Sequence, residues 1–248
     1  MADGLLLLHA FPLDASMWEP QRTEFAGALP VVAPNDPGFG GEAAAAGHTM
    51  TMEAAADAAL RALDVAGVQR ACVVGLSMGG YVALAFLRKY PDRVCGLVLA
   101  NTRADADDDA AKERRAGLAG RLRSEGNGFL ADSPPPLLSP GAPEPLWQRA
   151  RDTIRRQPAE AIAAAALGMA ARADMRSALA GISVPTLVVT STGDTLIPPE
   201  ITRPIAEQVP GATLEVIEGA GHLSNLEAPE AFNRALRAHL VRCGMLAG

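Results

Sequence analysis

The stretch from Ala71 to Tyr81, which reads ACVVGLSMGGY, constrains the fold more than any other part of the chain. It opens with a short apolar, partly β-branched run, Cys72 to Val74, which is typical of a buried strand. Residues 75–79 then form a G-x-S-x-G turn, and apolar residues recur at helical spacing after it. Strand, tight turn and helix in this order predict a sharp reversal that strains Ser77 and exposes its hydroxyl.

Two glycines fit such a turn, because a side chain at position 75 or 79 would collide with the neighbouring chain. The alternative is an ordinary glycine-rich turn between a strand and a helix, with no chemistry of its own. The pentapeptide alone does not decide between the two. The rest of the chain has to decide.

The size and composition fit one α/β domain, or a core with one insertion. The chain has 248 residues, 49% of them apolar, which is enough to bury a large core. Its net charge of −6 argues against nucleic-acid binding, which needs a basic face. No stretch approaches the roughly 20 apolar residues that span a bilayer, and the first residues lack the pattern of a signal peptide. We therefore expect a cytoplasmic protein with no membrane or nucleic-acid partner.

The three cysteines, Cys72, Cys95 and Cys243, have no spacing that is typical of a metal site. Two lie on predicted strands and the third lies near the C-terminal end. We interpret them as reduced thiols of a cytoplasmic protein. No metal ion and no organic cofactor is expected.

Short apolar runs alternate with amphipathic stretches, which predicts a doubly wound, mostly parallel sheet. The predicted strands are residues 5–8, 31–33, 72–74, 94–100, 185–190 and 214–217. The predicted helices of this part are 18–29, 51–66 with Thr51 as its N-cap, the segment after Ser77, 200–209 and 228–241.

The alternation stops between residues 103 and 180. Helical segments such as 144–156 and 158–171 follow one another there without a strand signal. We therefore expect an α/β core made of residues 1–102 and 181–248, with residues 103–180 as a helical cap.

The start of this insertion is strongly charged. Four aspartates between residues 105 and 109 precede five basic residues between 112 and 123. Acidic residues at the start and basic residues at the end suit the dipole of a helix. A solvated helical face is favoured over a specific anion site. No arginine is assigned to a substrate carboxylate.

Three candidate catalytic residues, Ser77, Asp194 and His222, each follow a predicted strand. In an open parallel sheet the carboxyl ends of the strands share one edge, where ligands bind, so these side chains can meet. Their order along the chain is the order expected of a nucleophile elbow. Each has a structural alternative, since Asp is common in turns and a lone His is usually a surface or core residue. Because all three residues follow strands of the same predicted sheet, the pattern favours a catalytic triad.

With these residues in place, the chain resembles the α/β-hydrolase superfamily over nearly its whole length. The resemblance rests on Ser77 in GLSMGG, Asp194 in TGDTLIPP and His222 in GAGHLSNLEAP. It looks most like the branch of small carboxylesterases and 3-oxoadipate enol-lactonases. A serine at the nucleophile position disfavours the haloalkane dehalogenase and epoxide hydrolase branches.

Residues 9–12, His-Ala-Phe-Pro, are similar to the His-Gly-x-Pro oxyanion segment of this family. The resemblance implies that the backbone N–H groups of Phe11 and Met78 bind the oxyanion. Ala10 stands where the family has Gly, and Asn35 stands where the family has an acidic residue two positions before Pro-Gly.

The family usually has a β-hairpin before the first strand predicted here, but only four residues precede that strand. The sheet would then lack its first two strands, and the short strand at 31–33 would be an edge. Because an unpaired edge invites pairing, we expect a loop or partner chain to cover it, including a second copy in a homo-oligomer. The alternative expectation is that the natural chain starts upstream of Met1.

The resemblance implies a serine hydrolase that cleaves a small carboxylic ester or lactone through an acyl-enzyme. Acyl transfer, perhydrolysis or carbon–carbon cleavage by the same triad is the alternative, and a non-catalytic ligand-binding receptor ranks last. An apolar pocket mouth is predicted from residues that flank the triad: Phe11, Met78, Ile197 and Leu223. Trp147 either roofs this pocket or anchors the cap to the core.

Overall fold

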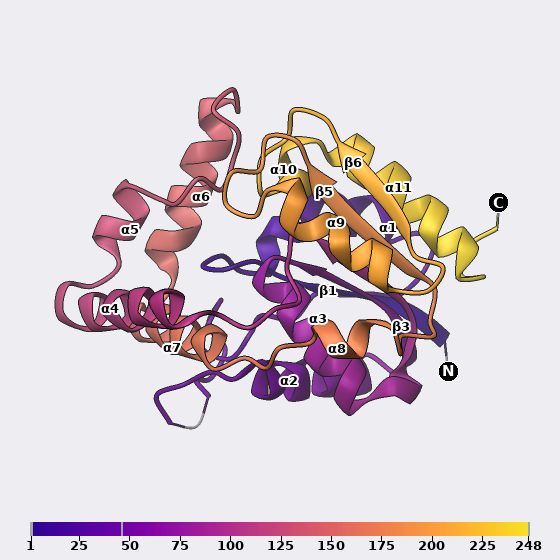
Figure 1. The fold of residues 1–248 in the computed structure, drawn as a ribbon, viewed down its shortest axis with the longest axis horizontal. Helices are drawn as coiled ribbons and strands as arrows, with labels where there is room; N and C mark the ends of the chain where they lie inside the picture. Colours follow the sequence, from indigo (N-terminus) through magenta and orange to yellow (C-terminus); the bar gives the residue numbers. More distant parts are fainter. Residues whose placement is uncertain (1, 46, 248) are drawn as a thin grey trace.

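A computed structural model describes residues 2–45 and 47–247 of the chain. Figure 1 shows a sheet that is flanked by helices, with further helices grouped at one end. The strands are β1 (Ala2–Leu8), β2 (Val31–Val32), β3 (Val68–Leu76), β4 (Val94–Ala100), β5 (Thr186–Ser191) and β6 (Thr213–Ile217). The helices that flank the sheet are α1 (Glu19–Phe25), α2 (Met52–Val65), α3 (Met78–Lys89), α8 (Arg176–Leu179), α9 (Pro199–Gln208), α10 (Ser224–Glu227) and α11 (Pro229–Arg242).

The six strands are parallel and lie in the order β2-β1-β3-β4-β5-β6. The predicted doubly wound, mostly parallel sheet is confirmed. From β1 the chain steps outward to β2, then returns to the other side of β1 and continues through β3 to β6. The sheet therefore changes direction between β1 and β3, and ligands bind at such a point in open α/β sheets. The two-residue β2 forms one edge, and its cover by a partner or loop stays a prediction.

Strand β3 is longer than the apolar run that predicted it. Its second half is buried throughout, but Gln69 and Arg70 near its start are exposed. These polar residues belong to the strand because β3 pairs with β1 from Val68 onward. Backbone pairing of this kind leaves no apolar pattern in the sequence.

Helix α2 begins where the sequence predicts. The Thr51 side chain accepts a hydrogen bond from the Ala54 N–H at 3.1 Å, which caps the first turn. The helix ends at Val65, shortly before Gly67, whose φ is +67°. Helices α2 and α3 pack together, as do α1 and α11.

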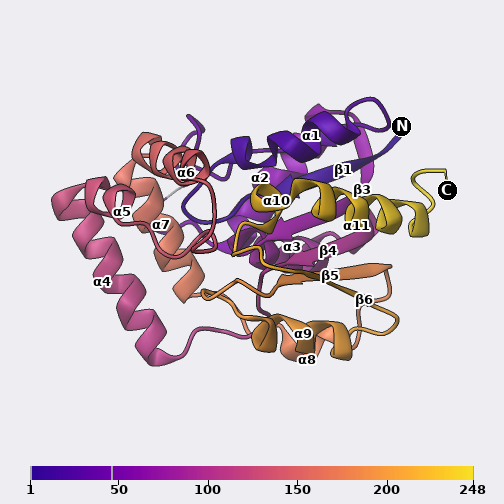
Figure 2. The same ribbon diagram turned by 90° about the horizontal axis from the view of Figure 1, so that it is seen from above.

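The segment between β4 and β5 contains four helices that stand apart from the sheet: α4 (Asp109–Glu125), α5 (Gly128–Asp132), α6 (Glu144–Arg156) and α7 (Ala159–Ala170). Figures 1 and 2 both place them beyond the end of the sheet that lies away from the N-terminus, where the strands have their carboxyl ends. Helix α4 packs along α7, and α5 packs against α6. No residue between 103 and 180 is in a strand, and all of these residues are described.

This helical segment starts and ends at one place. The Met175 N–H donates to the Ala104 carbonyl at 2.7 Å, and the Arg172 guanidinium donates to the Asp105 carbonyl at 3.1 Å. The chain between residues 105 and 174 therefore leaves the core and returns to it at neighbouring points. No helix in residues 2–45 or 47–247 has the length and apolar character needed to cross a membrane.

Candidate active site

Ser77 lies between β3 and α3 with φ 57° and ψ −117°, a strained conformation for a residue with a side chain. A Cβ at Gly75 would lie 2.1 Å from the Gly79 carbonyl oxygen. A Cβ at Gly79 would lie 2.1 Å from the Leu8 carbonyl oxygen. The turn is therefore closed to side chains at both glycines, and Ser77 has the strained conformation that the sequence predicts. The residue is only 8% exposed, so the predicted exposure of its hydroxyl is limited to the cavity that it lines.

Asp194 and His222 form a buried pair. The His222 Nδ1 atom lies 2.8 Å from Asp194 Oδ2, and both side chains are fully buried. The other carboxylate oxygen accepts the backbone N–H groups of Leu196 and Ile197, each at 2.9 Å. An ionised carboxylate only accepts hydrogen bonds, so an ionised Asp194 requires the proton on Nδ1, and in a neutral imidazole Nε2 then has the lone pair.

The Nε2 atom of His222 is buried and has no hydrogen-bond partner in the described part of the chain. No described hydrogen bond joins it to the Ser77 hydroxyl. Ser77 is connected to the Asp194–His222 pair through the residues after β4. Thr102 Oγ1 donates to the Ser77 carbonyl at 2.8 Å, and Asn101 Nδ2 donates to Asp194 Oδ2 at 3.0 Å.

Asn101 is a candidate functional residue that the sequence analysis missed. It is fully buried, and its φ of 44° is one that Asn tolerates better than most residues. Its amide also donates to Ser191 Oγ and accepts from Ser224 Oγ, both at 2.7 Å. Its position directly after β4, at the edge where the candidate triad lies, is the signal that could have identified it.

The candidate oxyanion donors are positioned by different elements. The Phe11 N–H makes no hydrogen bond with any described residue, and Met78 is the first residue of α3, so its N–H has no acceptor within that helix. The segment before Phe11 is held by His9, whose Nδ1 lies 3.1 Å from the Ala10 carbonyl oxygen and whose Nε2 accepts the Asp36 N–H at 3.0 Å. Burial raises the pKa of the Asp36 carboxyl, and the nearby His9 opposes that shift.

A cavity of about 510 Å³ adjoins Ser77. Its apolar lining is Phe11, Leu118, Leu130, Met169, Leu196 and Ile197. Its charged lining is Arg103, Asp107, Arg114 and Arg115. Tyr81 also lines the cavity, and burial raises the pKa of its phenol while nearby arginines oppose the shift. The lining is more charged than the sequence analysis expected, because α4 turns part of its charged surface toward Ser77.

The structure divides the five residues predicted at the pocket. Phe11 and Ile197 line the cavity, whereas Met78, Trp147 and Leu223 are not among its lining residues. Leu223 is fully buried, and its N–H donates to the Leu137 carbonyl at 2.8 Å. Trp147 lies on α6 and packs, partly buried, against the core.

One group of described residues could hold a metal ion. Ligand atoms of Cys72, His239 and Cys243 lie within 4.8 Å of one another. Cys72 belongs to β3, and the other two lie one helical turn apart at the end of α11, so sequence spacing alone does not reveal the group. The group shares no residue with the candidate triad.

Comparison with known proteins places these features among hydrolases. A model of the Alpha/beta hydrolase family matches residues 5–235. The pimeloyl-[acyl-carrier protein] methyl ester esterase of Aromatoleum aromaticum is 31% identical over 243 residues, which covers 91% of this chain and 93% of that protein. The 3-oxoadipate enol-lactonase 2 of Acinetobacter baylyi is 28% identical over 244 residues, which covers 96% of this chain and 89% of that protein.

Solved structures give a similar result. A thermophilic esterase from Thermogutta terrifontis, with malate bound, is 41% identical and has a TM-score of 0.93, covering 98% of this chain and 92% of that one. The enol-lactonase from Burkholderia xenovorans LB400 is 29% identical and has a TM-score of 0.86, covering 97% of this chain and 92% of that one.

Proposed function

Because this chain belongs to the alpha/beta hydrolase family, we propose that it is a serine hydrolase that cleaves a small carboxylic ester or lactone through an acyl-enzyme. One observation carries the proposal. His222 Nδ1 is bonded to Asp194 while its Nε2 lone pair is buried and unused in the described residues, at the sheet edge that also holds the strained Ser77. The relatives named as esterases and enol-lactonases support ester hydrolysis in general.

In the first step Ser77 Oγ attacks the carbonyl carbon of the ester, and His222 Nε2 takes the hydroxyl proton. Asp194 keeps the imidazole in the tautomer with Nδ1 protonated, and its negative charge stabilises the imidazolium that forms. The hydrogen bond between Ser77 and His222 is expected to form with substrate, since catalytic hydrogen bonds are often loose without it.

The negative charge that develops on the carbonyl oxygen needs donors. The backbone N–H groups of Phe11 and Met78 are available for this role, because neither has a partner of its own in the described loop and helix start. Removing one such donor typically costs on the order of 3 kcal/mol of transition-state stabilisation.

The second half of the reaction reverses these roles. The His222 imidazolium gives its proton to the leaving alkoxide, and the acyl group stays on Ser77 Oγ. His222 then takes a proton from a water molecule, whose oxygen attacks the acyl carbon, and the carboxylic acid leaves as the Ser77 hydroxyl is restored. No step needs a metal ion or an organic cofactor.

We also propose that residues 103–180 act as a cap over this site. Leu118 on α4, Leu130 on α5 and Met169 on α7 all line the cavity that adjoins Ser77. The core then supplies the reacting groups, and the helical segment supplies much of the wall against which the substrate packs.

Replacing the nucleophile tests the proposed function. Ser77→Ala is expected to lower kcat by roughly 10⁴-fold or more while the fold stays intact, because the acyl-enzyme cannot form. The assay is a panel of p-nitrophenyl esters of graded chain length and of enol-lactones. Ser124→Ala, at an exposed position on α4 outside the cavity, is the matched control and should keep the wild-type rate. Esterase activity that survives in Ser77→Ala would refute the proposal.

A further inference from the structure

The cavity beside Ser77 carries an excess of positive charge. Three arginines, Arg103, Arg114 and Arg115, line it against a single aspartate, Asp107. The chain as a whole has the opposite sign, with a net charge of −6. Positive charge is therefore concentrated at the place where the proposed substrate binds.

Two of these arginines are paired with carboxylates. Arg103 makes a bidentate contact with Asp105, at 2.6 and 2.5 Å, and Arg115 pairs with Asp107. Asp107 also binds Arg172 Nη1 at 2.7 Å. Three guanidinium groups thus share two carboxylates.

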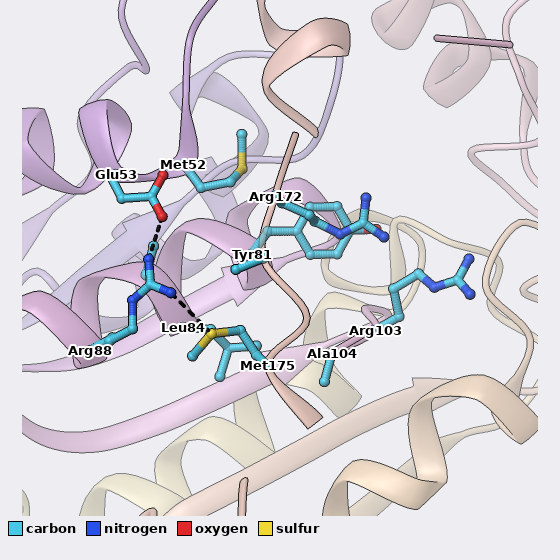
Figure 3. A pocket seen from close by; sticks show the side chains of 11 residues that line it. Met52, Glu53, Tyr81, Leu84, Arg88, Arg103, Ala104, Arg172 and Met175 are labelled. Carbon is cyan, nitrogen blue, oxygen red and sulfur yellow. Dashed lines mark hydrogen bonds and ion pairs between the residues drawn. The ribbon is translucent and has the colours of Figure 1, made fainter. Parts of the chain in front are cut away.

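Arg172 donates to the carbonyl oxygens of Asp105 and Met169 and contacts the Asp107 carboxylate, but one of its nitrogens has no acceptor in the described part of the chain. Its guanidinium lies over the Tyr81 ring, 4.3 Å from the ring centre, and Figure 3 shows the two side chains next to each other. The side chain is only 4% exposed, and its Nη2 is buried with no acceptor in the described part of the chain. Positive charge near Tyr81 is therefore only partly compensated from within the protein.

Arg114 is the lining arginine without a partner among the described residues, and it is exposed to solvent. It lies on α4 next to Arg115 and makes no hydrogen bond or ion pair with any residue that the structure describes. A guanidinium group offers five N–H donors in a planar fork that matches a carboxylate. An unpaired guanidinium on the wall of a substrate cavity is suited to bind an acidic group that enters with the substrate.

We propose that Arg114 binds a carboxylate carried by the substrate, so that the preferred substrates are mono-esters of dicarboxylic acids. This inference rests on the proposed function. The ester carbonyl lies at Ser77, the free carboxylate lies against α4, and apolar residues such as Leu118 and Ile197 cover the carbon chain between them. A cavity of about 510 Å³ has enough volume for a mono-ester of a small dicarboxylic acid.

The test compares two methyl esters of equal chain length, monomethyl glutarate and methyl pentanoate, which differ in the terminal carboxylate. Hydrolysis is followed by pH-stat titration. We expect the wild type to prefer the acidic ester by about tenfold in kcat/KM, because only the acidic ester can make the charged contact with Arg114. Arg114→Gln should reduce this preference about tenfold, mainly through a higher KM for monomethyl glutarate.

Arg121→Gln is the matched control. Arg121 lies on the same helix but pairs with Glu125 and does not line the cavity, so both esters should be cleaved at wild-type rates. Arg114→Glu should reverse the preference, favouring methyl pentanoate over monomethyl glutarate. The wild-type preference should also weaken as salt is added, because the interaction is between charges in a cavity open to solvent.

A binding measurement separates this inference from the proposed function. Glutarate is titrated into Ser77→Ala protein, with and without Arg114→Gln, and the second substitution should weaken binding about tenfold. Equal kcat/KM of the wild type for the two esters, or a preference that Arg114→Gln leaves intact, would overturn the carboxylate site while leaving a serine hydrolase. If the wild type cleaves neither ester but glutarate binding still depends on Arg114, the proposed hydrolase is overturned and the carboxylate site remains.

Discussion

Asn101 is one of the residues that position the candidate acid, Asp194. Its side-chain amide donates to Asp194 Oδ2, the same oxygen that His222 Nδ1 contacts. Ser191 and Ser224 hold this amide from two further elements. Asn101 touches no reacting atom, so we regard it as a positioning residue.

Asn101→Ala is therefore expected to lower kcat by about ten- to a hundredfold and to change KM by less than about threefold, since a hydrogen bond to a charged group is lost. Steady-state kinetics on one ester would measure this. Asn225→Ala is a control at an equally buried asparagine that binds Met17 and Gln21 instead of the pair. It should reduce stability and leave kcat unchanged, whereas equal losses of kcat in the two variants would argue against positioning.

Single residues differ in how well the sequence predicts them. Asp194 and His222 could be identified because each follows a strand, and the structure brings them into contact. The sequence analysis did not identify Asn101, because its hydrogen-bond partners lie about 90 or more positions away in the chain. Arg114 escaped because the docking angle of α4, which no local pattern encodes, decides which of its charged residues face the cavity.

At the scale of elements, the crossing of α3 over β1 depends on a glycine. The Gly79 Cα lies so close to β1 that a Cβ would be 2.1 Å from the Leu8 carbonyl oxygen. The nearest atoms are backbone atoms of Leu8 and His9, so no flexible side chain could move aside for the added Cβ. The first turn of α3 and the end of β1 can approach this closely only without a side chain at position 79.

Gly79→Ala is expected to reduce the free energy of unfolding by about 2–3 kcal/mol or more, because overpacked sites must shift their backbone. Urea denaturation would measure the loss. Gly117→Ala on α4 is the matched control, since nothing lies within 4 Å of the added Cβ. It should raise stability by up to about 1 kcal/mol, because alanine favours a helix over glycine. Equal stability of the two variants would contradict the close approach.

Most elements could be predicted, and the exceptions have a physical cause. Helices α6 and α7 were expected at 144–156 and 158–171 and are found at Glu144–Arg156 and Ala159–Ala170. Strand β4 matches its prediction at both ends. Strand β3 was expected to be shorter, because its exposed first residues are held by pairing with β1, which only the fold supplies.

At the scale of the whole molecule, one carboxylate ties the two ends of the helical segment together. Asp107, which precedes α4, binds Arg115 on α4 and Arg172 after α7, and its side chain is only 2% exposed. Burial opposes the charge of Asp107, but the hydrogen bonds and charges of the two arginines outweigh it and lower the pKa of this carboxyl. The folded state therefore favours the ionised form.

Asp107→Asn is expected to cost about 3–5 kcal/mol in the free energy of unfolding, because it leaves the Arg172 charge buried without its partner. The folded pKa lies below the unfolded value of about 3.9, so the stabilisation is present above that pH and is lost as the pH falls through the folded pKa. The difference between wild type and variant in urea denaturation should therefore shrink from pH 6 to pH 3. Asp132→Asn, which breaks an exposed pair with Arg155, should cost less than about 1 kcal/mol. A difference that stays constant with pH would contradict this account.

The junction at Ala104 and Met175 bears on how such a protein can diversify. The segment between these residues adds no strand to the sheet, so its length does not enter the register of β4 with β5, although it also contacts the core elsewhere, as at Leu137 and Leu223. A different helical segment joined at Ala104 and Met175 would lie over the same Ser77, Asp194 and His222 side chains and would offer a different wall to bound molecules. Related proteins could in this way differ in the molecules that they bind while the proposed catalytic residues stay the same.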